Sequence, residues 1–167
     1  MRFTFVPEFY LDTFDLASAE FLKAEGVKGI ILDIDNTLEP YEHALPGEHV
    51  IRWLKSLSES GIRAAIVSNN GKERVTAFNE SIGLPAYYKA KKPFKKNLLR
   101  AMKDMNTTRE ETILMGDQVF TDVWAAHNAG IRAILVPPIN DKRDAFTKFK
   151  RLLERPVLSK YNRRNNK

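Results

Sequence analysis

The chain of 167 residues is long enough for one domain with a substantial core and short for two. Its hydrophobic fraction of 43% and charged fraction of 29% are ordinary for a folded protein, and the lack of cysteine excludes a disulfide, a zinc–thiolate site and a thiol nucleophile. The start of the chain lacks a signal-peptide pattern, and no apolar run approaches the roughly 20 residues that span a bilayer. We therefore expect a single domain over 1–167 without a transmembrane segment.

The net charge of +6 is concentrated near the end of the chain. Residues 142–167 carry ten Lys or Arg side chains against Asp144 and Glu154, whereas the other 141 residues carry 17 basic and 19 acidic side chains. We define a basic tail from about residue 155 to 167 within this region. Its charge suits an anionic membrane, nucleic acid or the ribosome without choosing among them. A solvated end over 162–167 is the alternative.

The predicted elements alternate between strand and helix after an N-terminal turn or helix that runs through Phe21 and Leu22. Short apolar runs predict strands, and apolar residues at helical spacing, often closed by glycine, predict helices. In chain order we expect a strand at 29–34, helix 47–60, strand 62–67, helix 72–82, strand 86–89, helix 95–105, strand 112–115, helix 121–128, strand 131–136 and helix 144–153.

This alternation predicts an α/β fold, a Rossmann-like parallel sheet with helices on both faces and right-handed crossovers. In such a sheet the ligand site lies outside the carboxyl ends of the strands. Polar residues do follow the predicted strands at that end. They comprise Asp33, Asp35, Asn36 and Thr37 after the first strand, Ser68, Asn69 and Asn70 after the second, Lys91 and Lys92 after the third, and Asp117 with Asp122 after the fourth.

These residue types fit phosphoryl transfer. Asp33 and Asp35 leave a strand end on the same side, and a divalent cation would relieve their repulsion. A third carboxylate from Asp117 would complete an oxygen-rich site suited to Mg²⁺. Asp33 would attack phosphorus, and Asp35 would act as the general acid and base. Ser68 and backbone N–H groups would hold phosphate oxygens, and Lys92 would offset their charge.

Four motifs in this order resemble those of the haloacid dehalogenase superfamily phosphatases: DIDNTL at 33–38, SNN at 68–70, KP at 92–93 and GDQVFTD at 116–122. The resemblance implies a magnesium-dependent phosphatase with a phospho-aspartyl intermediate on Asp33. It implies that the main-chain carbonyl of Asp35 is a further metal ligand. Beside Ser68 and Lys92, we expect Asn36 and Asn69 as further candidate phosphate ligands. Lys91 remains a competitor for the role of Lys92, and Asp122 is expected either to touch the metal or to support Asp117.

The spacing between motifs leaves no room for a large cap domain, so the site should be open to a large or surface-bound substrate. Within the superfamily the capless pattern and the basic end resemble the group that contains phosphatidylglycerophosphatase. The resemblance implies a lipid-headgroup phosphatase in the cytoplasm, with peripheral contact at the inner membrane surface through the tail. The alternatives are a phosphatase of a nucleotide, sugar phosphate or phosphoprotein, and a regulatory protein that binds nucleic acid or a protein.

Two further groups of residues carry charge or metal-binding potential. Lys89, Lys91, Lys95 and Lys96 are denser around Lys92 than a solvated face requires, and they could bind a second phosphate or an anionic surface. The three histidines, His43, His49 and His127, have no mutual metal-ligand spacing and are expected to be surface or packing residues.

Overall fold

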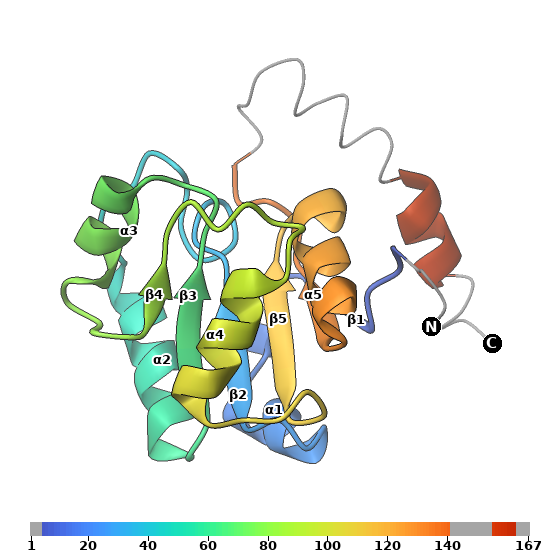
Figure 1. Cartoon of the computed structure of the whole chain (residues 1–167), viewed down its shortest axis with the longest axis horizontal. Helices are drawn as coiled ribbons and strands as arrows, with labels where there is room; N and C mark the ends of the chain where they lie inside the picture. Colours follow the sequence, from blue (N-terminus) through green and yellow to red (C-terminus); the bar gives the residue numbers. More distant parts are fainter. Residues whose placement is uncertain (1–4, 141–154, 163–167) are drawn as a thin grey trace.

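The apolar runs of the sequence form a six-stranded sheet in the computed structural model, which describes residues 5–140 and 155–162 (Figure 1). All strand pairs are parallel, in the order β1-β6-β5-β2-β3-β4. The strands are β1 (Phe9–Tyr10), β2 (Gly29–Leu32), β3 (Arg63–Val67), β4 (Ala86–Tyr87), β5 (Thr112–Gly116) and β6 (Arg132–Leu135). The central strands β2 and β5 are buried throughout, as their continuous apolar sequences require. The predicted α/β fold with a parallel sheet is confirmed.

Helices cover both faces of the sheet, also as predicted. The helices are α1 (Ala19–Ala24), α2 (Glu48–Glu59), α3 (Lys72–Asn79), α4 (Lys96–Met105) and α5 (Trp124–Ala129), with a 3-10 turn η1 (Phe14–Leu16), a π-helical turn η2 (Val119–Val123) and a helix at 155–162. Because side chains alternate along a strand, Ile30 and Leu32 face the core formed with α1, α2 and α3, and Ile31 faces the core formed with α4 and α5.

Some element boundaries differ from the prediction. The N-terminal stretch through Phe21 and Leu22 contains the expected turn and helix, η1 and α1, but Phe9 and Tyr10 before them form a strand that pairs with β6. Two residues carry no periodic pattern, and this strand exists only because β6 offers it a partner. Helix α3 ends at Asn79, short of 82, and the helix expected at 121–128 begins as the π-helical turn η2. The predicted helix at 144–153 lies outside the described residues.

Residues 155–162, the first part of the basic tail, form a helix that lies beside the N-terminal strand. Its Val157 and Leu158 pack against the core on the α5 side. The Tyr161 hydroxyl accepts a hydrogen bond from the Tyr10 backbone N–H, 3.0 Å away. This part of the tail is therefore joined to the sheet. Among the described helices, none combines the length and apolar character that crossing a membrane requires.

The connections that leave the carboxyl ends of β2 and β3 contain one helix each and no inserted domain. Between β2 and β3 the chain forms a loop and α2, and between β3 and β4 it forms a turn and α3. Both connections agree with the prediction that no large cap domain is inserted there. The strand register places Leu32 of β2 beside Ile66 of β3 and Met115 of β5, so the residues that follow these strands emerge together.

Candidate active site

The carboxyl ends of β2 and β5 and the loop after β4 bring three carboxylates and one lysine together. Lys92 Nζ lies 2.9 Å from Asp33 Oδ1 and 2.6 Å from Asp122 Oδ1. Asp33 is 7% exposed and Lys92 6%, so both charges are removed from most of the surrounding water. The carboxylate oxygens of Asp33, Asp117 and Asp122 include one from each residue that lie within 4.8 Å of one another. A buried cluster of this kind requires a compensating positive charge.

The electrostatics of the cluster follow from this packing. Burial raises the pKa of the Asp33 carboxyl to about 7, against the opposing charge of Lys92 and with further increases from the nearby Asp122 and Asp117 carboxylates. Burial lowers the pKa of Lys92, but the carboxylates of Asp122 and Asp33 outweigh it, so this pKa lies above its usual value. Lys92 is therefore held as an ammonium ion between two acidic side chains.

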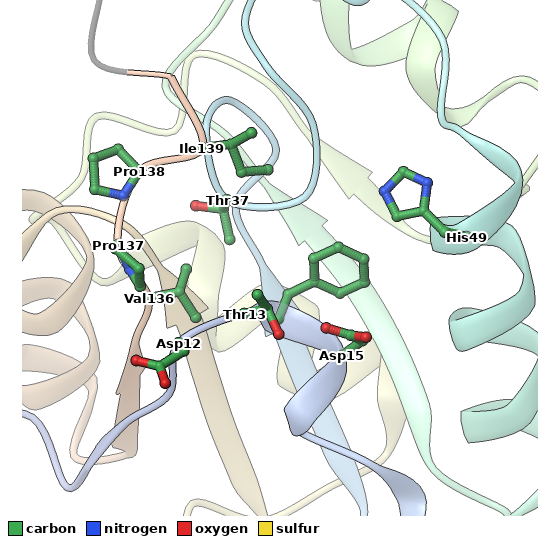
Figure 2. Close-up of a pocket in the computed structure, with 10 residues that line it drawn as sticks. Asp12, Thr13, Asp15, Thr37, His49, Val136, Pro137, Pro138 and Ile139 are labelled. Carbon is green, nitrogen blue, oxygen red and sulfur yellow. The ribbon is translucent and has the colours of Figure 1, made fainter.

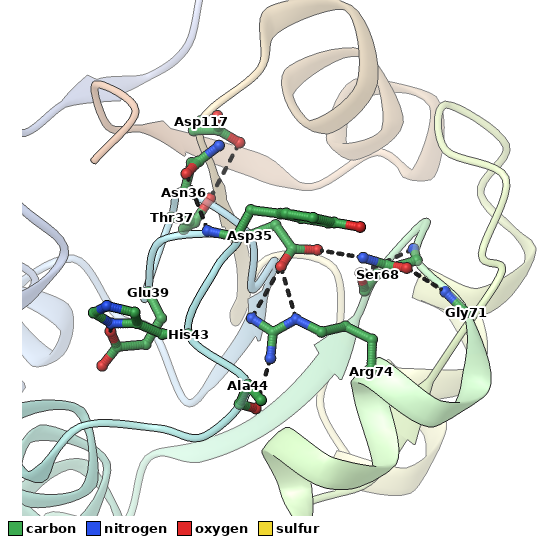
Figure 3. Close-up of polar contacts among 12 residues, drawn as sticks. Asp35, Asn36, Thr37, Glu39, His43, Ala44, Ser68, Gly71, Arg74 and Asp117 are labelled. Atoms are coloured by element: carbon green, nitrogen blue, oxygen red, sulfur yellow. Dashed lines mark hydrogen bonds and ion pairs between the residues drawn. The ribbon is translucent and has the colours of Figure 1, made fainter. Parts of the chain in front are cut away.

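Asp117 follows β5 and contacts the turn that follows β2. The Thr37 hydroxyl donates to Asp117 Oδ1 across 3.3 Å (Figure 3). Asp122 has a different set of contacts, because its Oδ2 accepts from the Gln118 N–H at 3.1 Å while its Oδ1 contacts Lys92. Asp122 therefore contacts Lys92 and the backbone N–H of Gln118, the residue before η2. The contact with Lys92 was not among the roles expected from the sequence.

Gly116 makes the approach of Asp122 possible. A Cβ atom at residue 116 would overlap the Asp122 side chain, including its carboxyl carbon. Packing against Asp122 therefore requires glycine at this position of the GDQVFTD motif. The glycine leaves room for the carboxylate that contacts Lys92, a requirement that the sequence alone does not reveal.

Asp35 does not belong to the three-carboxylate cluster, and its carboxylate lies against Arg74 of α3 (Figure 3). Its Oδ1 accepts from Arg74 Nε and lies 3.0 Å from Arg74 Nη2, and its Oδ2 accepts from Asn70 Nδ2 at 3.0 Å. Arg74 Nη1 also donates to the Ala44 carbonyl at 2.7 Å. Two donors thus fix the carboxylate of Asp35 in one orientation. Sequence reasoning missed Arg74, although its position in the first turn of the helix after SNN is a usable signal.

The SNN segment mainly fixes the loop that carries Lys92. Asn69 Oδ1 accepts from the Lys92 N–H at 2.7 Å, and Asn69 Nδ2 donates to the Lys92 carbonyl at 3.4 Å. Asn69 was expected to be a phosphate ligand, whereas its observed contacts are with the main chain of the lysine. Ser68 is buried, and its hydroxyl accepts from the Asn70 N–H at 3.1 Å.

Asn36 forms the tight turn between the two halves of the DIDNTL motif. Its φ of 60° is left-handed, a conformation that asparagine tolerates better than most residues. Its N–H donates to the Glu39 carbonyl at 2.7 Å, and its carbonyl accepts from the Ile139 N–H at 3.0 Å. Within the described part of the chain, the buried Asn36 Nδ2 has no hydrogen-bond partner. Such a buried donor needs a hydrogen-bond partner, and the described residues do not supply one.

The remaining candidates occupy peripheral positions. Lys91 is exposed, and only the neighbouring Lys92 enters the cluster. His43 and His49 both contact the buried carboxylate of Glu39, and His127 contacts Glu8. The expectation that the histidines are surface or packing residues is consistent with these contacts.

A pocket of about 360 Å³ lies beside the DIDNTL turn (Figure 2). Apolar walls from Phe14 and Val136 combine with the carboxylates of Asp12 and Asp15. Thr37 lines this pocket and also donates to Asp117, so the pocket adjoins the acidic cluster.

Comparison with known proteins agrees with this arrangement. Residues 18–136 match the family described as haloacid dehalogenase-like hydrolase. The probable phosphatase YqeG of Bacillus subtilis (strain 168) is 37% identical over 162 residues, which cover 97% of this chain and 94% of that protein. Phosphatidylglycerophosphate phosphatase 1, chloroplastic/mitochondrial, of Arabidopsis thaliana is 29% identical over 161 residues, which cover 89% of this chain and 45% of the relative.

The fold has counterparts among solved structures. The cobalt-bound deoxy-D-mannose-octulosonate 8-phosphate phosphatase of Haemophilus influenzae superposes with a TM-score of 0.54 at 18% identity, covering 83% of this chain and 93% of that chain. At this level of identity the similarity concerns the fold alone. The chain thus spans nearly all of the Bacillus relative and less than half of the Arabidopsis one.

Proposed function

Because the chain belongs to the haloacid dehalogenase-like hydrolases and is a phosphatase, we propose that it hydrolyses a phosphomonoester through a covalent phosphate on Asp33. The observation that carries this proposal is the buried contact of Lys92 with both Asp33 and Asp122. A lysine held charged beside a carboxylate is suited to oppose the charge that two anionic groups, nucleophile and phosphate, bring together. Asp122 is assigned here as the residue that positions this lysine.

The reaction divides into two displacements at phosphorus. An Asp33 carboxylate oxygen attacks, the bond from phosphorus to the substrate oxygen breaks, and Asp35 donates a proton to the departing alkoxide. Asp35 then accepts a proton from water as that water attacks phosphorus, and the bond to Asp33 breaks to release inorganic phosphate. Arg74 and Asn70 support this role, because they fix the Asp35 carboxylate between them.

The donor set fits a divalent cation. Asp33 and Asp117 offer buried carboxylate oxygens close together, and oxygen ligands of this kind suit Mg²⁺. Asp122 is less available because Lys92 and the Gln118 N–H already occupy its oxygens. The main-chain carbonyl of Asp35 is the further ligand that family resemblance implies. When bound, Mg²⁺ would neutralise charge on the phosphate and the surrounding carboxylates.

Two polar side chains are candidates for holding phosphate. Ser68 presents a hydroxyl at the end of β3, and the Asn36 amide has an N–H group without a partner in the described residues. Asn69 acts indirectly in this proposal, by fixing the main chain of Lys92. The catalytic groups are thus Asp33, Asp35 and Lys92, with the phosphate held around them.

We assign the substrate to the lipid-headgroup phosphates. The similarity over 89% of this chain to a relative named phosphatidylglycerophosphate phosphatase supports this assignment. The short β2–β3 and β3–β4 connections support it as well, because a headgroup that remains in a bilayer needs a site reached from a surface. The exposed lysines around Lys92 add a cationic setting suited to a phospholipid.

The test is phosphate release from phosphatidylglycerophosphate in mixed micelles with Mg²⁺, measured beside p-nitrophenyl phosphate and a panel of nucleotides and sugar phosphates. We expect fast lipid turnover that EDTA and Asp33→Asn abolish. Turnover of a soluble phosphate alone, still dependent on Asp33, would retain the mechanism and refute the lipid assignment. Absence of activity on every substrate, with tight binding to nucleic acid, would favour the regulatory alternative.

A further inference from the structure

Phe94 is the most exposed large hydrophobic side chain among the described residues, with 71% of its surface accessible. It belongs to the segment 88–96, here called the lysine loop, which runs from the end of β4 to the first residue of α4. This loop runs along the end of the sheet to which the strand arrows point (Figure 1). The same loop supplies Lys92 to the acidic cluster, so Phe94 lies two residues from the site.

Hydrogen bonds hold the lysine loop on its inner side. The Phe94 N–H donates to the Lys91 carbonyl at 2.9 Å, and the Pro93 carbonyl accepts from Asn128 Nδ2 at 3.0 Å. The Lys92 N–H is bonded to Asn69, as described above. The backbone is therefore fixed at Phe94 and at the two residues before it, and the exposed aromatic ring belongs to an anchored loop.

The charge of the lysine loop has a single sign. Lys89, Lys91, Lys95 and Lys96 are exposed, and the segment contains no acidic residue. None of these four side chains has an ion-pair partner within residues 5–140 and 155–162. An outward aromatic ring among lysines matches proteins that lie at an anionic membrane interface, where the ring enters the bilayer and the lysines meet headgroup phosphates.

Other exposed apolar side chains follow strand ends at the same edge. Tyr41 and Leu45, 56% and 63% exposed, lie in the loop after β2, and Ile139, 48% exposed, follows β6. The loop after β2 is closed by Glu39, whose carboxylate accepts from the Gly47 N–H at 2.7 Å. Leu45 and Ile139 are aliphatic side chains, which gain from burial among acyl chains and do not stack on bases, so these two residues favour a bilayer over a nucleic acid.

We propose that the lysine loop docks this protein on an anionic lipid bilayer, with Phe94 inserted and Lys89, Lys91, Lys95 and Lys96 on the headgroups. Leu45 and Ile139 contribute apolar contact from neighbouring loops. Docking in this way sets the acidic cluster against the membrane surface, because Lys92 of the same loop already lies within it. The inference deepens the proposed lipid-headgroup function, yet bilayer binding itself requires no chemistry at Asp33.

The experiment is cosedimentation of the full-length protein with vesicles of phosphatidylglycerol and phosphatidylcholine, and with vesicles of phosphatidylcholine alone, at low and physiological salt. We expect binding to the anionic vesicles that Phe94→Ser weakens roughly tenfold or more. The pair Lys95→Gln/Lys96→Gln should weaken it roughly thirtyfold at low salt. Since all three side chains are exposed, the thermal midpoints of these variants should match that of the parent protein.

A matched control removes the same charge from the opposite end of the sheet. Lys23 and Lys103 are exposed and lie in α1 and α4, just before the amino ends of β2 and β5. Lys23→Gln/Lys103→Gln should bind vesicles like the parent protein. In addition, brominated lipids should quench the tryptophan fluorescence of Phe94→Trp more than that of the parent protein, which already contains Trp53 and Trp124. Equal losses for both lysine pairs, or unchanged binding by Phe94→Ser, would overturn the proposal, since net charge or the basic tail would then explain binding.

The outcome for docking is separable from the outcome for catalysis. Asp33→Asn should bind anionic vesicles like the parent protein while releasing no phosphate. A parent protein that binds vesicles through Phe94 but leaves phosphatidylglycerophosphate intact would support docking and refute the lipid substrate. Binding to an RNA oligonucleotide that depends on Phe94 and exceeds binding to vesicles would overturn docking on a bilayer.

Discussion

Replacing Lys92 by methionine in the metal-free protein tests the electrostatics of the acidic cluster. Methionine keeps the apolar stem and removes the charge that lies 2.9 Å from Asp33 and 2.6 Å from Asp122. Each attraction is worth about 6 kcal/mol at an effective dielectric constant of about 20, and the burial of Lys92 offsets part of this. Breaking buried pairs of this kind typically costs about 3–5 kcal/mol. For a chain of this size the thermal midpoint should fall by about 6–20 °C.

The loss of stability caused by Lys92→Met should grow as pH rises. The pKa of Asp33 is raised by folding to about 7, so the folded carboxyl keeps its proton in a range where the unfolded one has lost it. Its contribution to stability therefore falls as pH rises from about 4 through 7. Because Lys92 opposes this increase, its removal raises the folded pKa further. The difference in stability between Lys92→Met and the parent protein should consequently be larger at pH 8 than at pH 5.5.

The assay is thermal unfolding followed by circular dichroism in EDTA at these two pH values. Lys91→Met is the matched control, since Lys91 is adjacent to Lys92 but exposed and outside the acidic cluster. It should unfold like the parent protein. Adding Asp33→Asn to Lys92→Met should recover part of the loss at pH 8. A loss that is equal at both pH values, or shared by Lys91→Met, would refute the reasoning.

Three further predictions address positioning and packing. Arg74→Gln should lower kcat for an alkyl phosphate about 10-fold or more beyond any loss for p-nitrophenyl phosphate, with little change in KM. The reason is that p-nitrophenolate, a good leaving group, needs less protonation by Asp35 than an alkoxide does. Equal losses of kcat on both substrates would contradict a positioning role for Arg74. Gly116→Ala should displace Asp122, destabilise the fold by about 1–3 kcal/mol and remove most activity, whereas full activity with an unchanged melting curve would contradict the packing argument. Tyr161→Phe should cost about 1 kcal/mol, read as a lower thermal midpoint, since a backbone N–H of β1 loses its partner; no change would mean that water replaces the hydroxyl.

The sequence predicted the parallel sheet and its ligand edge well, because buried strands and helices have strong periodic patterns. β2 and β5 read as continuous apolar runs, and both proved buried on both faces. The short strand β1 could not be predicted, since Phe9 and Tyr10 adopt it only by pairing with β6, more than 120 residues away in the chain. Pairing at such a distance leaves no local signal.

In the candidate site, too, some features could be predicted from the sequence and others could not. Residues that close a strand, such as Asp33 and Asp117, could be placed from the sequence because the sheet aligns its strand ends. The contacts of Asp35 with Arg74 and of Asp122 with Lys92 depend on side-chain directions, which spacing along the chain does not specify. The overlap that Gly116 avoids is likewise a property of the folded packing.

The two-residue lengths of β1 and β4 have a consequence for self-association. These strands form the two edges of the sheet, whereas the strongly apolar segments at 29–32 and 112–116 lie in its interior. Long, flat apolar edges are templates on which other chains add strands and aggregate. Here each edge offers few free backbone groups, and Tyr161 already occupies the Tyr10 N–H. The strongly apolar strands are thus paired with a neighbouring strand on both sides, and the short edge strands limit the addition of strands from other molecules.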